Sequence, residues 1–141
     1  MTSRVEWIRH YEKPSSQFLK KANAINRNRE ARKILKYAFI HAQQDEHRMG
    51  NHCAIILHGS WDNVVSVSVN NKVRHAEVGA IELMPPGIDR SECFMVVVRA
   101  TIRGKMKNSM PCCNCMDTLK MSGISSCIYS NGHFNFTRWN I

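Results

Sequence analysis

The sequence has few acidic residues and contains no long apolar run. Eleven Asp and Glu stand against twenty Lys and Arg in 141 residues, so the formal net charge is +9 at pH 7. No stretch is long and apolar enough to span a membrane, and residues 1–10 lack the apolar run of a secretory signal. Internal repeats and low-complexity segments are absent. We therefore expect an intracellular, cytoplasmic protein with no membrane partner.

The composition fits one globular domain. Apolar residues make up 43% of the chain and charged residues 22%, which is an ordinary globular balance. The length suits a single core, expected over about residues 26–139 with an N-terminal extension over 1–25. In a reducing compartment the six cysteines are more often metal ligands or buried thiols than disulfides.

The positive charge is concentrated in the first third of the chain. Residues 1–48 carry eleven Lys and Arg against five Asp and Glu. Such an excess favours a partner that carries phosphate, either a nucleotide or a polynucleotide. The alternative is a solvated basic helix face, which the same residues fit equally well.

Hydrophobic periodicity predicts alternating helices and strands. A helix is indicated by the buried stripe Ala31, Ile34, Leu35, Ala38, Phe39 and Ala42, and its end is expected near residues 49–51. Strands are expected at 53–58, 63–70, 94–102, 127–129 and 134–139. In the second strand Val65, Val67 and Val69 are expected on one face. Short helices are expected at 75–84 and from Pro111 to about 122. This order predicts an α/β fold, a three-layer α/β/α sandwich with a mixed five-stranded sheet.

One histidine and two cysteines have the spacing of a zinc site. His75 stands two residues before Glu77, and Pro111 precedes Cys112 and Cys115, which lie about one helical turn apart. An imidazole and two thiolates leave the fourth position of a tetrahedral zinc ion open, as in catalytic sites. Zinc lowers the pKa of water to about 7 in favourable sites, and a carboxylate two residues from a ligand can move the proton.

A structural zinc site is the alternative and would need a fourth protein ligand. The chain offers six candidates for it: His52, His58, Cys93, Cys113, Cys127 and His133. Cys113 points about 100° round the helix from Cys112 and is expected to pack instead. Cys53, Cys93 and Cys127 fall in or beside strands and are expected to be buried.

These motifs resemble the cytidine deaminase-like superfamily of zinc-dependent nucleobase deaminases. The likeness runs from about Arg48 to Tyr129 and is carried by the segments 66–70, 75–81 and 109–115. The ending at 119–130 resembles deoxycytidylate-type and small viral or phage-like deaminases. The resemblance implies the cytidine deaminase-like fold.

The resemblance also implies roles for individual residues. His75, Cys112 and Cys115 become the zinc ligands and Glu77 the catalytic proton shuttle. Asn70 matches an asparagine that contacts the sugar, with Asn71 as the neighbouring alternative. Further expected substrate contacts come from the residues themselves: Trp61 for base stacking, and Arg74, Lys72 or Arg103 for a phosphate.

The subfamily stays open. Gly79 stands where deoxycytidylate deaminases usually carry Asn, and no long helix follows Ser130 as in the tRNA-adenosine type. The free-nucleoside type usually has Cys where this chain has His75. The expected function is hydrolytic conversion of cytosine to uracil in a nucleotide or in single-stranded DNA or RNA, with release of ammonia.

Two alternatives accompany this expectation: adenosine-to-inosine deamination of tRNA, and a non-catalytic zinc-containing module that binds nucleic acid. Oligomerisation is left open, since Met106, Met110, Met116 and Met121 suit an interface as well as a core.

Overall fold

The computed structural model describes residues 28–43, 51–71 and 75–141. Expectations for residues 1–27, and for the helix end near residue 49, lie outside the described parts of the chain. The described elements are α3 (Arg29–Gln43), β1 (Asn51–His58), β2 (Val64–Val69), α4 (Ala76–Glu82), the 3-10 turn η1 (Arg90–Glu92), β3 (Cys93–Ala100), β4 (Met106–Lys107), α5 (Cys113–Ser122), β5 (Ser126–Ser130) and β6 (Phe136–Asn140).

The strands form one mixed, open sheet in the order β2-β1-β3-β5-β6. Only β3 and β5 pair in parallel, and the other pairs are antiparallel. The expected mixed sheet and the antiparallel edge strand β6 are confirmed. The expected number of five strands is wrong, because the two-residue strand β4 pairs with the end of β3 and makes a sixth.

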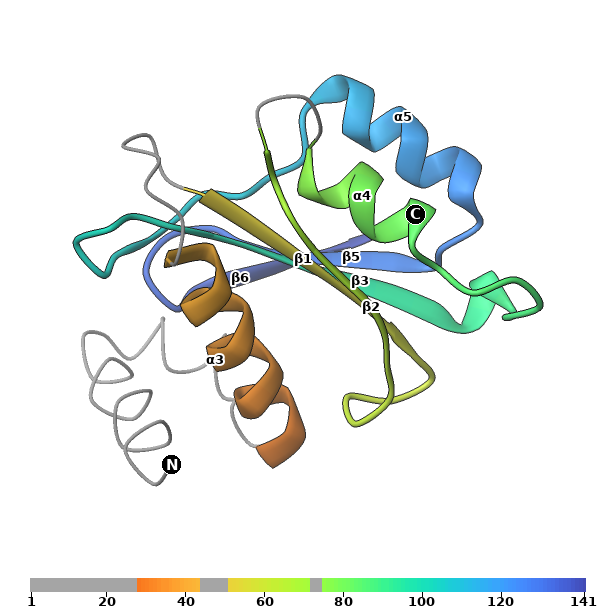
Figure 1. The fold of residues 1–141 in the computed structure, drawn as a ribbon, viewed down its shortest axis with the longest axis horizontal. Helices are drawn as coiled ribbons and strands as arrows, with labels where there is room; N and C mark the ends of the chain where they lie inside the picture. The colour runs from red at the N-terminus through yellow and green to blue at the C-terminus, as the bar shows by residue number, and fades with distance from the viewer. Residues whose placement is uncertain (1–27, 44–50, 72–74) are drawn as a thin grey trace.

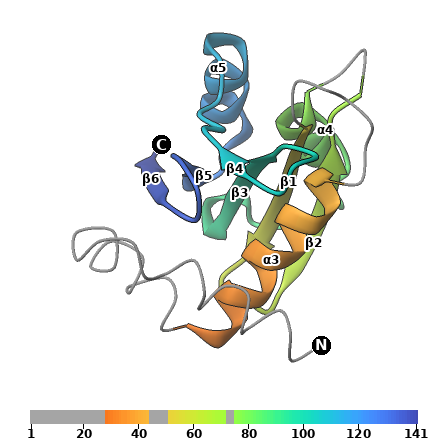
Figure 2. The same cartoon turned by 90° about the vertical axis from the view of Figure 1, so that its left-hand side faces the viewer.

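Helices cover both faces of the sheet. Figure 1 shows α3 on one side and α4 with α5 on the other, and the quarter turn of Figure 2 shows the same division. One buried cluster joins Leu35 and Phe39 of α3 to alternate residues of β1 and β3. The second joins Ala76 and Ala80 of α4 and Leu119 of α5 to the intervening strand residues. The strand β3 has a continuous apolar run because both of its faces are buried.

The predicted stripe of α3 is confirmed except at Ile34. Ala31, Leu35, Ala38, Phe39 and Ala42 are all buried, while Ile34 is half-buried at the edge of the same cluster. A helix of this kind is held mainly by the burial of its apolar face and only weakly by intrinsic propensity. None of the helices in the described parts of the chain has the length and apolar content that crossing a membrane requires.

The prediction that Val65, Val67 and Val69 share a face is wrong at Val65. Val67 and Val69 pack on the cluster under α3, whereas Val65 packs on the cluster under α4. The pairing register between β1 and β2 shifts between Ile56 and Leu57. One extra residue in a strand moves its neighbours to the other face, because side chains alternate with a period of two.

Helix α5 begins two residues later than Pro111. Its N-cap is Cys112 in an extended conformation, so the expected placement of Pro111 at the first helical position is wrong. The helix ends as expected at Gly123, which adopts a left-handed conformation with φ of 85°. Glycine adopts this conformation without the strain that a Cβ would add.

Candidate metal centre

The first predicted ligand, His75, stands at the N-cap of α4. Its backbone is extended and its side chain makes no capping bond to the helix, so the imidazole is available to other groups. The buried face of the helix consists of Ala76, Glu77, Gly79 and Ala80. The small residues at 76, 79 and 80 suit a helix that lies close to the sheet, and Ser66 Oγ donates a buried hydrogen bond of 2.8 Å to Ala80 O. The strand β2 thus fixes the helix that carries His75 and Glu77.

A buried serine pair fixes the chain just before the two candidate cysteine ligands. Ser109 Oγ donates to Val97 O of β3 at 2.8 Å and accepts from Ser130 N at 2.8 Å. Ser109 N also donates to Ser130 O at 2.8 Å. These bonds fix the chain three residues before Cys112, at the point where β3 and β5 lie side by side. The sheet therefore positions the N-terminal turn of α5 and both thiols.

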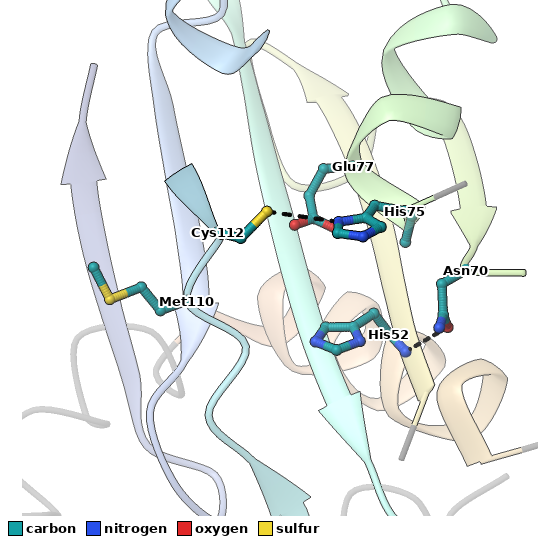
Figure 3. A pocket seen from close by; sticks show the side chains of 7 residues that line it. His52, Asn70, His75, Glu77, Met110 and Cys112 are labelled. Atoms are coloured by element: carbon teal, nitrogen blue, oxygen red, sulfur yellow. Dashed lines mark hydrogen bonds between the residues drawn. The ribbon is translucent and has the colours of Figure 1, made fainter. Parts of the chain in front are cut away.

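The three donor atoms converge as the sequence predicts. His75 Nδ1 lies 3.2 Å from Cys115 Sγ and 3.7 Å from Cys112 Sγ, and all three ligand atoms lie within 4.8 Å of one another. Ordinary Zn–N and Zn–S bonds at tetrahedral angles place nitrogen and sulfur about 3.6 Å apart. The donor set therefore fits a zinc ion, and Figure 3 shows Cys112 and His75 facing each other across the site.

Glu77 lies beside these ligands and is buried, with 4% of its surface exposed. Burial, and next the negative charge of Glu77, raise the pKa of the Cys115 thiol. The same two causes, in that order, raise the pKa of Cys127 to about 12. The carboxylate of this α4 residue therefore lies near Cys115 of α5 and Cys127 of β5. A cation at this position would offset the cost of burying the carboxylate.

None of the six alternative fourth ligands belongs to this donor group, which contains three residues in the described parts of the chain. His58 faces Glu92, with Nε2 3.3 Å from a carboxylate oxygen. His133 Nδ1 accepts from Met106 N at 2.9 Å. Cys93 and Cys127 are buried in the sheet, as predicted. Cys113 is exposed, so its expected role in packing is wrong, although it does stand outside the donor group.

The donor group opens into a pocket of about 220 Å³. Its lining consists of His52, Asn70, His75, Ala76, Glu77, Met110 and Cys112. Asn70, for which the resemblance implies a sugar contact, is thus part of the pocket lining. Its side-chain Oδ1 accepts a hydrogen bond from the backbone N of His52 at 2.8 Å, and its backbone N–H donates to His52 O at 3.1 Å. The amide nitrogen of Asn70 and the second lone pair of its oxygen are the groups that Asn70 can offer to a ligand.

Among the described residues, three other expected substrate contacts do not belong to this lining: Trp61, Asn71 and Arg103. Trp61 lies in the β1–β2 loop, at the opposite end of these strands from Asn70. Its ring packs edge-on against Phe94, with ring centroids 5.0 Å apart. Asn71 is exposed beside the pocket and does not line it. Arg103 is exposed in the turn between β3 and β4. Lys72 and Arg74 lie outside the described residues.

Sequence reasoning treated His52 only as an optional zinc ligand, whereas the structure makes it a wall of the pocket. Burial, the charge of Arg99 and the proximity of His75 lower the pKa of His52 to about 4. Its imidazole is therefore neutral at physiological pH, with one donor and one acceptor nitrogen. The signal that locates His52 is the β1–β2 register, which pairs Cys53 with Val69 and brings His52 to Asn70.

No family model, curated protein or solved structure matches this chain.

Proposed function

We propose that the protein is a zinc-dependent hydrolytic deaminase that converts cytosine to uracil in a nucleotide-containing substrate. One observation carries the proposal: a group of three zinc-type donors, two of which, His75 and Cys112, line an open pocket together with the buried carboxylate of Glu77. A catalytic zinc site has three protein ligands and an open position, and a hydrolysis needs a group that moves protons.

Three residues would hold the zinc ion, and one residue transfers protons. His75, Cys112 and Cys115 would hold the ion, which supplies the Lewis acidity that makes water nucleophilic at neutral pH. Glu77 takes the proton of the attacking water and delivers it to the ring nitrogen, and then assists the departure of the amino group as ammonia. His52 and Asn70 line the same pocket and offer neutral hydrogen-bonding groups to the substrate.

The buried position of Glu77 also speaks against a purely structural zinc site. A structural site is closed by four protein ligands, and the donor group has three among the residues that the structure describes. A buried carboxylate is costly unless it is paired, and a structural site has no use for one that borders an open pocket. The same residue is what a deaminating site requires.

The test replaces Glu77 by Gln, which keeps the size of the side chain and removes the proton acceptor. We expect ammonia release to fall at least 100-fold, the lower end of the range for general acid–base groups. Bound zinc should stay at one ion per chain because the ligands are untouched. Glu82→Gln is the matched control, since Glu82 is an exposed residue of the same helix outside the pocket lining, and it should keep full activity.

The substrates should include cytidine, deoxycytidine, their monophosphates, short single-stranded DNA and RNA, and the adenosine counterparts of each. Undiminished ammonia release by Glu77→Gln would overturn the assigned role of this residue. Release from adenosine substrates alone would overturn the choice of base. A zinc-loaded wild type that releases ammonia from no substrate would overturn the proposal as a whole.

A further inference from the structure

A row of three side chains leads away from the metal pocket across neighbouring strands. His52 of β1 pairs with Arg99 of β3, and Arg99 pairs with Lys107 of β4. Directly paired residues in antiparallel strands carry their side chains on the same face, about 5 Å apart. His52, Arg99 and Lys107, the pocket row, therefore lie side by side, and His52 is itself part of the pocket wall.

The pocket row faces the same side of the sheet as the donor group. Ala54 and Val97 are two residues from His52 and Arg99, and both pack on the cluster beneath α4 and α5. Side chains two apart in a strand share a face. Met106, the neighbour of Lys107, packs on the opposite cluster, so Lys107 points to the pocket side. A substrate in the pocket can continue along this row without passing round the sheet.

The segment that carries Arg99 and Lys107 is positively charged. Residues 93–116 contain four Lys and Arg and no Asp or Glu. Two of these, Arg103 and Lys105, are exposed in the turn joining β3 to β4, and this hairpin extends beyond the rest of the sheet in Figure 1. A cationic strip without acidic residues attracts phosphate groups.

The length of the pocket row favours a ligand with several phosphates over a ligand with one. Three adjacent strands span about 10 Å between the first and the third, before the reach of the Arg and Lys side chains is added. A mononucleotide carries a single phosphate group, so it would use only the first part of the row. A strand that continues beyond the target nucleotide can place further phosphates on Arg99 and Lys107.

We propose that the pocket row binds the sugar-phosphate backbone of a single-stranded polynucleotide whose target base enters the metal pocket. This inference rests on the proposed function, which it deepens by choosing a polynucleotide over a free nucleotide. Arg99 and Lys107 contact phosphates, and the imidazole of His52 positions the sugar or phosphate next to the target base. DNA and RNA share the backbone chemistry that the row recognises.

The experiment measures binding of fluorescein-labelled nine-nucleotide DNA and RNA, each with one central cytosine, to the zinc-loaded full chain. Glu77→Gln is used as the background so that the substrate is not consumed. Lys107→Gln should weaken binding roughly fourfold at 0.15 M salt and reduce the slope of log K against log salt by about 0.7, the loss of one phosphate contact on a single strand. Lys107 is exposed, so the fold should persist, and a thermal melt checks this.

Arg138→Gln is the matched control, because Arg138 is an exposed cation that pairs with Ile128, a residue of the opposite cluster. It should leave the salt slope unchanged. The inference is overturned if Lys107→Gln keeps the wild-type slope, if both variants lower it equally, or if the oligonucleotides bind no more tightly than cytidine monophosphate. The preferred oligonucleotide shows whether the strand is DNA or RNA.

The two proposals fail in different ways. Ammonia released from monophosphates by a protein with no affinity for oligonucleotides would overturn the pocket row and retain the deaminase. Oligonucleotide binding that depends on Lys107, without ammonia from any substrate, would support the row as a strand-binding surface and overturn the deaminase.

Discussion

At the scale of single residues, His52 shows how position changes the chemistry of a side chain. A histidine at the surface of a protein is partly protonated near pH 6.5. At the edge of the pocket, desolvation and the neighbouring charge of Arg99 lower the pKa of His52 to about 4. The imidazole therefore meets a substrate as a neutral group that can donate and accept a hydrogen bond.

The lowered pKa of His52 predicts an acid-dependent loss of stability. In the unfolded chain this histidine takes up a proton near pH 6.5, whereas in the folded protein it does so only near pH 4. The unfolded state thus binds more protons between these values, and the free energy of unfolding falls as the pH falls through this window. Above about pH 6.5 the imidazole is neutral in both states, so its titration does not lower the free energy of unfolding there.

The measurement is urea unfolding of metal-free wild type and His52→Gln at pH 7.0 and pH 4.5. Gln does not titrate, so the wild type should lose roughly 2 kcal/mol more than the variant between the two values, after allowance for solvent screening. Equal losses in both proteins would show that His52 titrates alike in the folded and unfolded chain.

At the scale of elements, the serine pair at residues 109 and 130 connects the sheet to the metal centre. Ser130 is fully buried, and its Oγ lies 2.6 Å from Lys107 O and 2.7 Å from Ser109 Oγ. Its hydroxyl also accepts from Arg99 N at 3.3 Å. The bonds therefore tie β3, β4 and β5 together immediately before the segment that carries Cys112.

Ser130→Ala should lower the free energy of unfolding by about 1–3 kcal/mol, because buried partners lose a hydrogen bond. It should also weaken zinc binding about tenfold or more, as loss of supporting contacts does at metal sites. Competition with a chromophoric chelator measures this affinity. Ser125→Ala is the control, since Ser125 Oγ bonds Cys93 O at 2.7 Å before the start of β5. Wild-type zinc affinity in Ser130→Ala would contradict the supporting role of the pair.

Elements with a strong periodic pattern were predictable from sequence, and elements fixed by pairing were not. The stripe of α3 apart from Ile34, and the apolar run of β3 as far as Ala100, appear as predicted because burial determines both. The strand β4 has two residues and forms only because the chain turns back onto β3. The face of Val65 depends on a register shift against Ile56 and Leu57, which belong to another segment.

The same distinction applies to the candidate site. The spacing of His75, Cys112 and Cys115 predicted a donor group, which the structure brings together. The place of His52 and the row that leads to Lys107 depend on the pairing of β1, β3 and β4. Local patterns in the sequence carry no record of that pairing, because it joins residues as far apart as Asn51 and Ala100.

At the scale of the whole molecule, the two faces of the sheet are covered differently. The helix α3 packs on one face through a stripe of buried side chains. On the other face, α4 and α5 are short, and their N-terminal ends meet at the donor group. A bound zinc ion joins these two helices directly, so its contribution to stability should be concentrated on this face.

Removal of zinc should therefore lower the melting temperature and loosen one face first. At free zinc of 100 times Kd the ion contributes about 2.7 kcal/mol, which corresponds to a shift of roughly 10 °C for a domain of this size. Hydrogen exchange after chelation should rise in the first turns of α4 and α5 before it rises in α3.

Cys112→Ser should abolish the zinc-dependent shift in melting temperature, while Cys113→Ser should retain it. Both thiols are exposed, and only Cys112 belongs to the donor group. An equal loss in both variants, or exchange that begins in α3, would show that the metal does not join α4 to α5.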